Sequence, residues 1–447
     1  MKRPSLFAPL LLGCLFLVAG VAHAGNWPQW RGAAFNGTSN ETQLPEKLDP
    51  NANLLWSAEL PGHGAGTPIV WNDRVFISCV EKGSFKLLAM CFDRKTGQLL
   101  WKKDVVIGFS SHPLNDMGSP SPVTDGKSVF FYYGTGDLAA FDMDGKPLWS
   151  RNIQKDHGSF NVQYLYSASP LLYKGKLYIQ VMHREQPYSN KKLETPADSY
   201  LLGIDPASGK DLFKVIRRTE AVGESKESYC TPMPYEGKNG TEVVLVGGDC
   251  VTGHDPETGR ELWRCGGWNT QHADYMRLVP SVLVADDLFI ICTPKVRGLV
   301  FAIRGGGQGL ITNTHIAWRN TELASDVCVP LHYQGNLYVL DGDFKKGVSC
   351  LDPKTGQRKW FAPLRSGAVL RTSPTGADGK IYVMNERGDV YVLSAADGKI
   401  LSTTSLGSEG TARASITAAQ GCVFVRTGVK LYAFGAKGQY QTTQAVH

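Results

Sequence analysis

The 447-residue sequence lacks most of the patterns that mark a chemical class of protein. Basic residues do not gather in runs, and a formal net charge of only +6 gives no support for nucleic-acid binding. There is no C-x-x-C-H haem motif, no H-E-x-x-H zinc motif and no G-x-S-x-G nucleophile elbow. After residue 24, no hydrophobic run is long enough to span a bilayer. These absences argue against a nucleic-acid-binding protein, a membrane-spanning protein and several enzyme classes.

The one long hydrophobic run lies at the N-terminus. Two basic residues precede the run LFAPLLLGCLFLVAGV, which ends in the A-x-A cleavage pattern Ala22-His23-Ala24. This layout predicts a signal peptide over residues 1–24, a mature chain from Gly25 and a periplasmic or secreted protein. Cys14 lies in LLGC, which resembles a lipobox, but the mostly apolar residues after it fit a cleaved signal peptide better than a lipoprotein.

Cysteine pairing is left open by the sequence. Nine cysteines remain after residue 24, and an odd number leaves at least one without a partner in the chain. Disulfides persist in exported proteins. Cys79 with Cys91, or Cys230 with Cys250, would be close enough if they lie on neighbouring strands.

Glycine is abundant, with 49 residues, and many of them belong to a repeated frame. The stretch HDPETGRELW (254–263) recurs as FDRKTGQLLW (92–101), IDPASGKDLF (204–213) and LDPKTGQRKW (351–360). FDMDGKPLW (141–149) is one residue shorter, and AADGKIL (395–401) is a degenerate copy. Repeats spaced by about 40 to 50 residues are the signature of propellers and related arrays.

Each copy follows short apolar runs separated by turn signals, which predicts four antiparallel strands per unit. Equivalent units begin near Thr67, Ser119, Ser167, Tyr229, Arg277, Val327, Arg371 and Arg413. The eighth unit has only three strands, and NLLWSAEL (53–60) supplies the fourth, which closes the ring and removes two sheet edges. The sequence therefore predicts an all-β, eight-bladed propeller over residues 53–437. An N-terminal extension (25–52) precedes it and a polar tail (438–447) follows.

The repeated frame is expected to be structural. Asp255 is placed to accept hydrogen bonds from backbone N–H groups two or three residues on, Thr258 adds a hydroxyl, and Gly259 permits a positive φ. Trp263 then falls on an outer strand, where its ring covers the seam between blades. A catalytic group is needed once, whereas these residues recur. The equivalent positions are Trp56, Asp93, Thr96, Gly97, Trp101, Asp142, Trp149, Asp205, Gly209, Asp352, Thr355, Gly356 and Trp360.

The frame D-x-x-T-G-x-x-x-W resembles the tryptophan-docking motif of quinoprotein alcohol dehydrogenases and of the wider family of PQQ-like β-propeller repeat proteins. WPQWRG (27–32) is similar to a segment of exported bacterial propellers in that family. The resemblance implies the fold. Catalysis by the quinoprotein enzymes requires pyrroloquinoline quinone (PQQ), a calcium ion, an acidic base and a vicinal cysteine pair over the quinone. This sequence has no Cys-Cys dipeptide. The motifs DMDG and DGD offer too few oxygens for calcium. No cofactor is expected, with PQQ and calcium as the alternative.

The connections predict which end of the propeller carries function. With strands a to d running outward in each blade, the a–b and c–d turns are short, apart from RGGGQGLITNTH (304–315). The b–c and d–a connections, such as 104–118 and 264–276, are long and varied. Binding residues concentrate on such loops. We call the end that carries them the working face.

Innermost strands begin at the working face, so their first residues ring the mouth of the central channel. Alignment on a shared proline places Arg277, Arg371 and Arg413 in one register, in blades 5, 7 and 8. Tyr229 holds that register in blade 4, and Asp326 lies one residue earlier in blade 6. Arginine suits carboxylate, phosphate or sulfate, and tyrosine suits a planar or sugar face. Alternatively, the arginines pair with Asp326, with backbone carbonyls or with neighbouring loops.

Histidines of the working-face loops form no metal motif. His112 belongs to the candidate site, and His157, His183 and His272 lie in other loops of that face. A zinc site needs three or four converging ligands, and none of these residues is spaced as a metal pair, so no metal is expected.

Three functions remain open from the sequence. We expect a non-catalytic, exported binding or scaffold module, whose partner is an envelope protein, an anionic small molecule or a glycan. The first alternative is a quinone-dependent oxidoreductase, motivated by the docking motif and the arginine-rich mouth. The second is a carbohydrate-binding or carbohydrate-active propeller, motivated by Tyr229, Tyr275 and Trp268. No catalytic residue is assigned.

Overall fold

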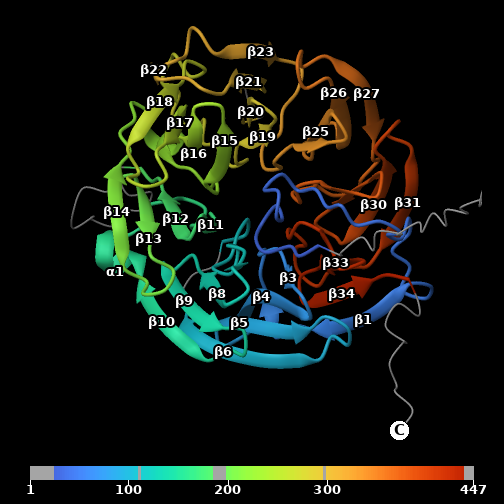
Figure 1. Ribbon diagram of the computed structural model, residues 1–447. Coiled ribbons are helices and arrows are strands. Elements are labelled where there is room, and N and C mark those ends of the chain that lie inside the picture. The colour runs from blue at the N-terminus through green and yellow to red at the C-terminus, as the bar shows by residue number, and fades with distance from the viewer. Residues whose placement is uncertain (1–24, 109–111, 185–197, 295–297, 437–447) are drawn as a thin grey trace, which may run out of the picture.

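The computed structural model describes residues 25–108, 112–184, 198–294 and 298–436. The predicted signal peptide and polar tail lie outside these ranges. Eight antiparallel sheets follow one another around a central axis (Figure 1), so the predicted eight-bladed propeller is confirmed. Within the described ranges, no helix has the length and apolar character needed to cross a membrane.

Blades 1 to 4 cover the first half of the ring. Blade 1 holds β2 (Gly62–His63), β3 (Ile69–Trp71), β4 (Arg74–Glu81), β5 (Lys86–Asp93) and β6 (Leu99–Ile107). Blade 2 holds β7 (Val123–Thr124), β8 (Ser128–Tyr132), β9 (Asp137–Asp142) and β10 (Pro147–Asn152). Blade 3 holds β11 (Leu171–Tyr173), β12 (Lys176–Val181), β13 (Tyr200–Ile204) and β14 (Asp211–Ile216). Blade 4 holds β15 (Met233–Gly237), β16 (Gly240–Gly247), β17 (Cys250–His254) and β18 (Glu261–Cys265). Two short helical segments, α1 (Ile153–His157) and the 3₁₀ turn η1 (Gly223–Lys226), lie in the d–a connections.

Blades 5 to 8 complete the ring. Blade 5 holds β19 (Leu283–Ala285), β20 (Leu288–Cys292), β21 (Val300–Arg304) and β23 (Ile316–Asn320). Blade 6 holds β24 (Leu331–Tyr333), β25 (Asn336–Asp341), β26 (Gly347–Leu351) and β27 (Arg358–Pro363). Blade 7 holds β28 (Thr375–Ala377), β29 (Lys380–Met384), β30 (Asp389–Ser394) and β31 (Ile400–Ser405). Blade 8 holds β32 (Thr417–Ala419), β33 (Cys422–Arg426), β34 (Lys430–Phe434) and, from the other end of the chain, β1 (Leu54–Glu59).

The two ends of the propeller chain meet in blade 8, as predicted. Strand β1 pairs antiparallel with β34, with Trp56 opposite Ala433 and Glu59 opposite Lys430. An N-terminal outer strand thus occupies the edge that β34 would otherwise expose. Closing the ring in this way removes an unpaired row of backbone donors and acceptors.

Two blades depart from the predicted four strands. In blade 1 the inner strand is interrupted, and β2 and β3 both pair with β4. The long c–d link of blade 5 forms β22 (Gly309–Leu310), which pairs in parallel with β18 and gives blade 4 a fifth strand. The sequence marked this link as unusually long but did not indicate that it crosses to the neighbouring blade.

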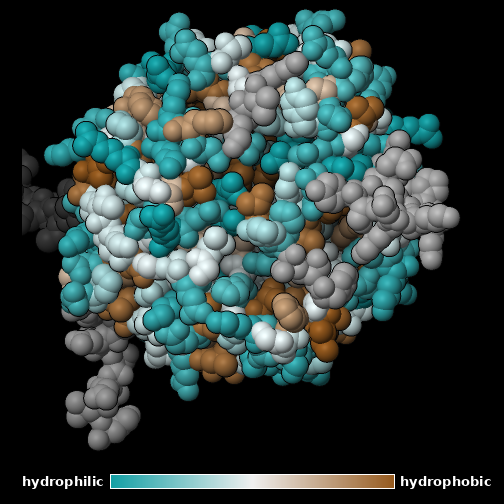
Figure 2. Space-filling model, turned by 180° about the vertical axis from the view of Figure 1, so that it is seen from behind, coloured by the Kyte–Doolittle hydropathy of each residue, from teal (hydrophilic) through white to brown (hydrophobic). Residues whose placement is uncertain are grey.

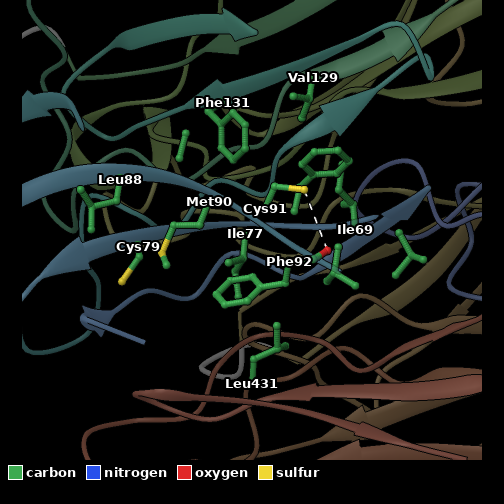
Figure 3. Close-up of a cluster of buried hydrophobic side chains, with 14 of the residues drawn as sticks. Ile69, Ile77, Cys79, Leu88, Met90, Cys91, Phe92, Val129, Phe131 and Leu431 are labelled. Atoms are coloured by element: carbon green, nitrogen blue, oxygen red, sulfur yellow. Dashed lines mark hydrogen bonds between the residues drawn. The ribbon is translucent and has the colours of Figure 1, made fainter. Parts of the chain in front are cut away.

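The core lies between the blades. Figure 3 shows Ile77 and Met90 from β4 and β5 of blade 1, with Phe131 of blade 2 on one side and Leu431 of blade 8 on the other. All four side chains are buried. A middle strand is covered on both faces, so the Leu-Leu-Ala-Met-Cys-Phe run of β5 is buried throughout, whereas the outer strand β6 is mostly exposed or half-buried.

The repeated Asp-x-x-Thr/Ser-Gly turn has a similar geometry in blades 1, 3, 4 and 6. Asp255 accepts hydrogen bonds from the backbone N–H groups of Glu257 at 2.9 Å and Thr258 at 2.8 Å, and from the Thr258 hydroxyl at 3.0 Å. Gly259 has a φ of 73°. The carboxylate therefore organises the turn and needs no ligand.

A tryptophan from the preceding blade lies on such a turn. The Trp56 indole donates to the carbonyl of Arg94 at 2.7 Å, and a Cβ added to Gly97 would lie 2.5 Å from the Trp56 ring. Equivalent bonds run from Trp101 to Met143, Trp149 to Pro206, Trp318 to Pro353 and Trp360 to Ala396. Trp263 differs, because blade 5 lacks the turn motif. It stacks on Phe289 of blade 5 at 5.2 Å, while its indole donates to Glu242 of its own blade.

The N-terminal extension crosses the end of the channel that carries the a–b turns (blue at the centre of Figure 1). Trp27 pairs with Val70 of β3, at the start of the extension. The buried Arg31 guanidinium donates to the carbonyls of Pro330 and Pro374 at 2.9 and 2.8 Å, and burial lowers the pKa of Arg31 to about 9. The extension is therefore bound to the inner strands of several blades. Seen from the opposite side, the surface is mostly hydrophilic and its hydrophobic side chains form separate patches (Figure 2).

Candidate ligand-binding site

A cavity of about 190 Å³ lies on the propeller axis, between the working-face loops and Trp30 of the N-terminal extension. All eight blades contribute to its wall. Arg277, Arg371, Arg413, Asp326 and Tyr229 are among the lining residues, so the structure brings these five sequence-predicted residues together. We call this space the axial cup, and Trp30 lies at its base.

Two rings of side chains form the wall, made by residues two positions apart in the segments that lead into the inner strands. The outer one, the mouth ring, consists of Ala65, Ser119, Ser167, Tyr229, Arg277, Val327, Arg371 and Arg413. The inner one, the hydroxyl belt, consists of Thr67, Ser121, Ser169, Thr231, Ser373 and Ser415. Valines take the belt position in blades 5 and 6, and Val279 together with Val327 of the mouth ring makes that side of the cup apolar.

The hydroxyl belt joins neighbouring blades. The backbone N–H of Thr67 donates to the Ser121 Oγ at 2.9 Å, Ser121 donates in the same way to Ser169 at 2.9 Å, and Ser169 to Thr231 at 3.0 Å. Two further bonds of this kind run from Val329 to Ser373 and from Ser415 to Thr67. Within the described residues, none of these five hydroxyl oxygens donates its own proton to a protein acceptor. The belt therefore leaves O–H donors for a ligand.

Arg277 is held by two carboxylates and a ring. Its guanidinium lies 3.0 Å from Glu224 and 3.6 Å from Asp326, and 4.8 Å from the centre of the Tyr164 ring. Burial lowers the pKa of Arg277, but Asp326 and Glu224 outweigh it and the net shift is upward. Arg277 is a fixed cation of the wall.

Arg371 and Arg413 share one carboxylate unequally. The Arg413 Nε donates to Glu386 at 2.7 Å, and a terminal nitrogen lies 3.4 Å from the Pro113 carbonyl. Arg371 lies 3.7 Å from Glu386 and 3.8 Å from Asp343, which is too far for a hydrogen bond. Its buried Nε has no hydrogen-bond partner in the described structure. Arg371 is thus the least satisfied of the three arginines.

Tyr229 and His112 have supporting positions. Tyr229 is only 7% exposed and its hydroxyl donates to the buried Glu227, which also pairs with Arg184. Burial raises the pKa of Tyr229 well above its usual value. The His112 ring lies edge-on against Tyr164 at 5.3 Å, behind the cup wall, and is not among the lining residues. Tyr229 therefore lines the cup with its hydroxyl directed to Glu227, whereas His112 supports the wall through Tyr164.

Other sequence-predicted aromatic and histidine residues lie outside the cup. Trp268 packs on Phe301 at 5.2 Å, and Tyr275 is exposed away from the lining. His157 lies 3.0 Å from Asp211, and the buried His183 accepts from the backbone N–H of Asn161 at 3.2 Å. His272 also lies away from the lining.

Sequence reasoning missed the belt, the base and the acidic partners. The belt did have a signal, since a serine or threonine precedes the aligned proline, or its isoleucine equivalent, in six units. Trp30 had no signal, because it reaches the axis from outside the repeat. Glu224, Asp343 and Glu386 lie in connections that share no common register, so their approach to the arginines was not readable.

Cysteine and metal chemistry receive no support from the described residues. All nine described cysteines are buried free thiols, so neither Cys79 with Cys91 nor Cys230 with Cys250 forms a disulfide. No group of three or more His, Cys, Asp or Glu side chains in the described ranges is arranged to hold a metal ion.

Known structures resemble this fold at low sequence identity. A europium-containing methanol dehydrogenase has a TM-score of 0.69 at 12% identity, covering 92% of this chain and 98% of its own. BamB from Moraxella catarrhalis has a TM-score of 0.59 at 14% identity, and the alignment covers 86% of this chain and 98% of BamB. Quinohemoprotein alcohol dehydrogenase from Comamonas testosteroni has a TM-score of 0.68 at 13% identity, and the alignment covers 92% of this chain and 81% of the dehydrogenase. At these identities the likeness establishes the fold alone.

Sequence comparison gives the family. No curated protein matches the chain significantly. The family profile described as "Outer membrane protein assembly factor BamB" matches residues 47–186 and 251–446, which is more than half of the sequence. These ranges include five of the six repeated turns and both ends of the ring. The chain therefore belongs to the PQQ-like β-propeller repeat family that this profile describes.

Proposed function

We propose that this protein is a non-catalytic binding module that holds a small ligand with a carboxylate or phosphate group in the axial cup. The observation that carries the proposal is Arg371. Its Nε has no hydrogen-bond partner among the described residues, and its terminal nitrogens lie 3.7 Å from Glu386 and 3.8 Å from Asp343, beyond hydrogen-bond distance. Arg371 lines the cup in the mouth ring, next to the hydroxyl belt. Anionic oxygens accept strongly from both kinds of donor.

The donors and the size of the cup favour a small anion. The lining contains three arginines and one carboxylate, Asp326, and the carboxylates of Glu224, Asp343 and Glu386 contact the same arginines from outside the lining. The positive charge is therefore balanced, and the proposal rests on the hydrogen-bond donors that Arg371 and the belt leave unused. A volume of about 190 Å³ is close to the roughly 150 Å³ of a cavity that holds benzene. The ligand is therefore small, or inserts only one end, and the valine side of the belt faces its apolar part.

The residues present do not fit the quinone-dependent alternative. Calcium takes six to eight oxygen ligands, whereas the lining offers one carboxylate, which already lies beside Arg277. The described cysteines are neither vicinal nor exposed. No reaction step is assigned to PQQ or calcium.

A binding screen tests the proposal. We would measure thermal shifts and calorimetric titrations of wild type with acetate, succinate, citrate and inorganic phosphate, with glucose as a neutral probe, and with PQQ plus calcium. Arg371→Ala should weaken binding of the best anion roughly tenfold to a hundredfold, the range for a hydrogen bond to a charged group. The control is Arg358→Ala, a partly exposed arginine of β27 whose Glu322 contact is 4.0 Å.

Each outcome decides the matter. Binding of an anion that depends on Arg371 and not on Arg358 supports the proposal. A neutral sugar that binds equally well to wild type and to Arg371→Ala, or no binding by any anion, would refute it. Dye-linked alcohol oxidation after addition of PQQ and calcium would favour the oxidoreductase instead.

A further inference from the structure

Glu41 of the N-terminal extension is a nearly buried carboxylate without a cation. It is 7% exposed, and its oxygens accept from the backbone nitrogens of Gly25 at 2.5 Å, Gln420 at 2.9 Å and Gly421 at 2.6 Å. No lysine, arginine or histidine of the described ranges forms an ion pair with it. A buried carboxylate is costly unless an opposite charge accompanies its hydrogen bonds.

Gly25 is also the residue at which the signal-peptide pattern predicts the mature chain to begin. In the uncut chain its nitrogen is a neutral amide with one proton. Hydrolysis of the Ala24–Gly25 bond leaves a carboxylate on Ala24 and an amino group on Gly25. That group has a usual pKa of about 8, so at neutral pH it is mostly an ammonium with three donors.

We propose that cleavage before Gly25 creates the missing cationic partner of Glu41, and that the resulting ion pair locks the N-terminal extension onto blade 8. The contact is already in place for it, since the Gly25 nitrogen lies within hydrogen-bond distance of the carboxylate. Processing changes the charge at this contact and leaves its geometry unchanged.

The partner surface is the turn between β32 and β33. Gln420 and Gly421 of that turn both donate to Glu41, and the Gln420 side chain donates to Asn26 at 2.9 Å. The backbone carbonyl of Gly25 accepts from Gln420 at 3.3 Å. Blade 8 is also the blade that β1 completes. The ammonium therefore stabilises the blade in which the two ends of the ring meet. We expect this blade to be less stable in the uncut chain than in the mature chain.

The first test is the site of cleavage. Mass spectrometry of the protein exported by a bacterial host should give a mature mass that begins at Gly25. A mature chain that begins at any other residue would overturn the proposal, because the ammonium would then lie away from Glu41.

The second test separates charge from packing. Chains that begin at a free Gly25, and the same chains acetylated at that nitrogen, are compared with and without Glu41→Gln. Glu41→Gln should lower the Tm of the free chain by about 2 °C more than it lowers the Tm of the acetylated chain. In a chain of this size, such a shift corresponds to a small change in the free energy of unfolding. The control Glu46→Gln, at an exposed residue of the same extension, should change the Tm of the free and the acetylated chains by the same amount. Equal effects of Glu41→Gln in the two backgrounds would refute the ion pair.

Discussion

His254 shows how a residue that looks chemical in the sequence is used structurally. It precedes the repeated turn of blade 4 and is fully buried, with its ring nitrogens 2.8 Å from the Gly259 carbonyl and 2.9 Å from the Thr252 hydroxyl. Burial lowers the pKa of His254 to about 4, so the folded protein holds it neutral. The unfolded chain binds a proton near pH 6.5, where the folded chain does not.

We therefore predict that His254 makes the protein less stable in acid. Its contribution is fully present above pH 6.5 and is lost as the pH falls toward 4, by an upper bound on the order of 3 kcal/mol. Burial raises the pKa of Asp249 to about 6, which acts in the opposite direction, so the variant must be compared with wild type at each pH. His254→Gln should show a smaller loss of Tm between pH 7 and pH 4.5. A slope equal to that of wild type, or of the control His315→Gln, would contradict this.

A second residue-scale prediction concerns Glu386, which contacts two arginines of the cup. Its carboxylate accepts from Arg413 and lies 3.7 Å from Arg371. If the proposed anion site is correct, Glu386→Gln should raise anion affinity roughly threefold to tenfold, since an adjacent negative charge disappears. The matched control is Glu409→Gln, an exposed partner of Lys82. Weaker anion binding by Glu386→Gln in titration calorimetry would show that the carboxylate orients the arginines instead.

At the scale of the element, the outer strands are joined to the next blade through aromatic side chains. Trp263 is 1% exposed and stacks on Phe289 of the next blade. Trp263→Ala should cost about 3–5 kcal/mol of unfolding free energy, as for other large core truncations, and should leave ligand affinity unchanged. Trp360→Ala, at a less buried ring with a longer hydrogen bond of 3.3 Å, should cost less. Urea unfolding measures both. A Trp263→Ala protein of normal stability that had lost only binding would contradict the structural role.

At the scale of the whole molecule, the N-terminal segment closes both the ring and the cup. It supplies β1 to blade 8 and Trp30 to the base of the cavity. A chain that lacks residues 25–60 exposes the edge of β34 and should lose its single cooperative thermal transition or aggregate. Calorimetry and size-exclusion chromatography would show this. A monomeric truncated chain with the Tm of the full mature chain would mean that closure contributes little.

The sequence by itself determined the architecture, because the repeat makes equivalent residues occupy equivalent places. The repeated frame set the phase of the units, the strand pattern of each unit gave eight blades, and the incomplete eighth unit required an outer strand from 53–60. The same equivalence brought Arg277, Arg371 and Arg413 to one opening, since residues in one register of a repeat face one axis.

Only the tertiary structure decided what surrounds those arginines. Glu224, Asp343 and Glu386 approach them from connections that do not repeat, and Trp30 reaches the axis from outside the repeat. The sequence also could not predict that β22 pairs with the neighbouring blade, or that all nine described cysteines are free thiols. A period in the sequence fixes the relation between copies of a unit, whereas contacts between non-repeating segments depend on how the closed ring packs.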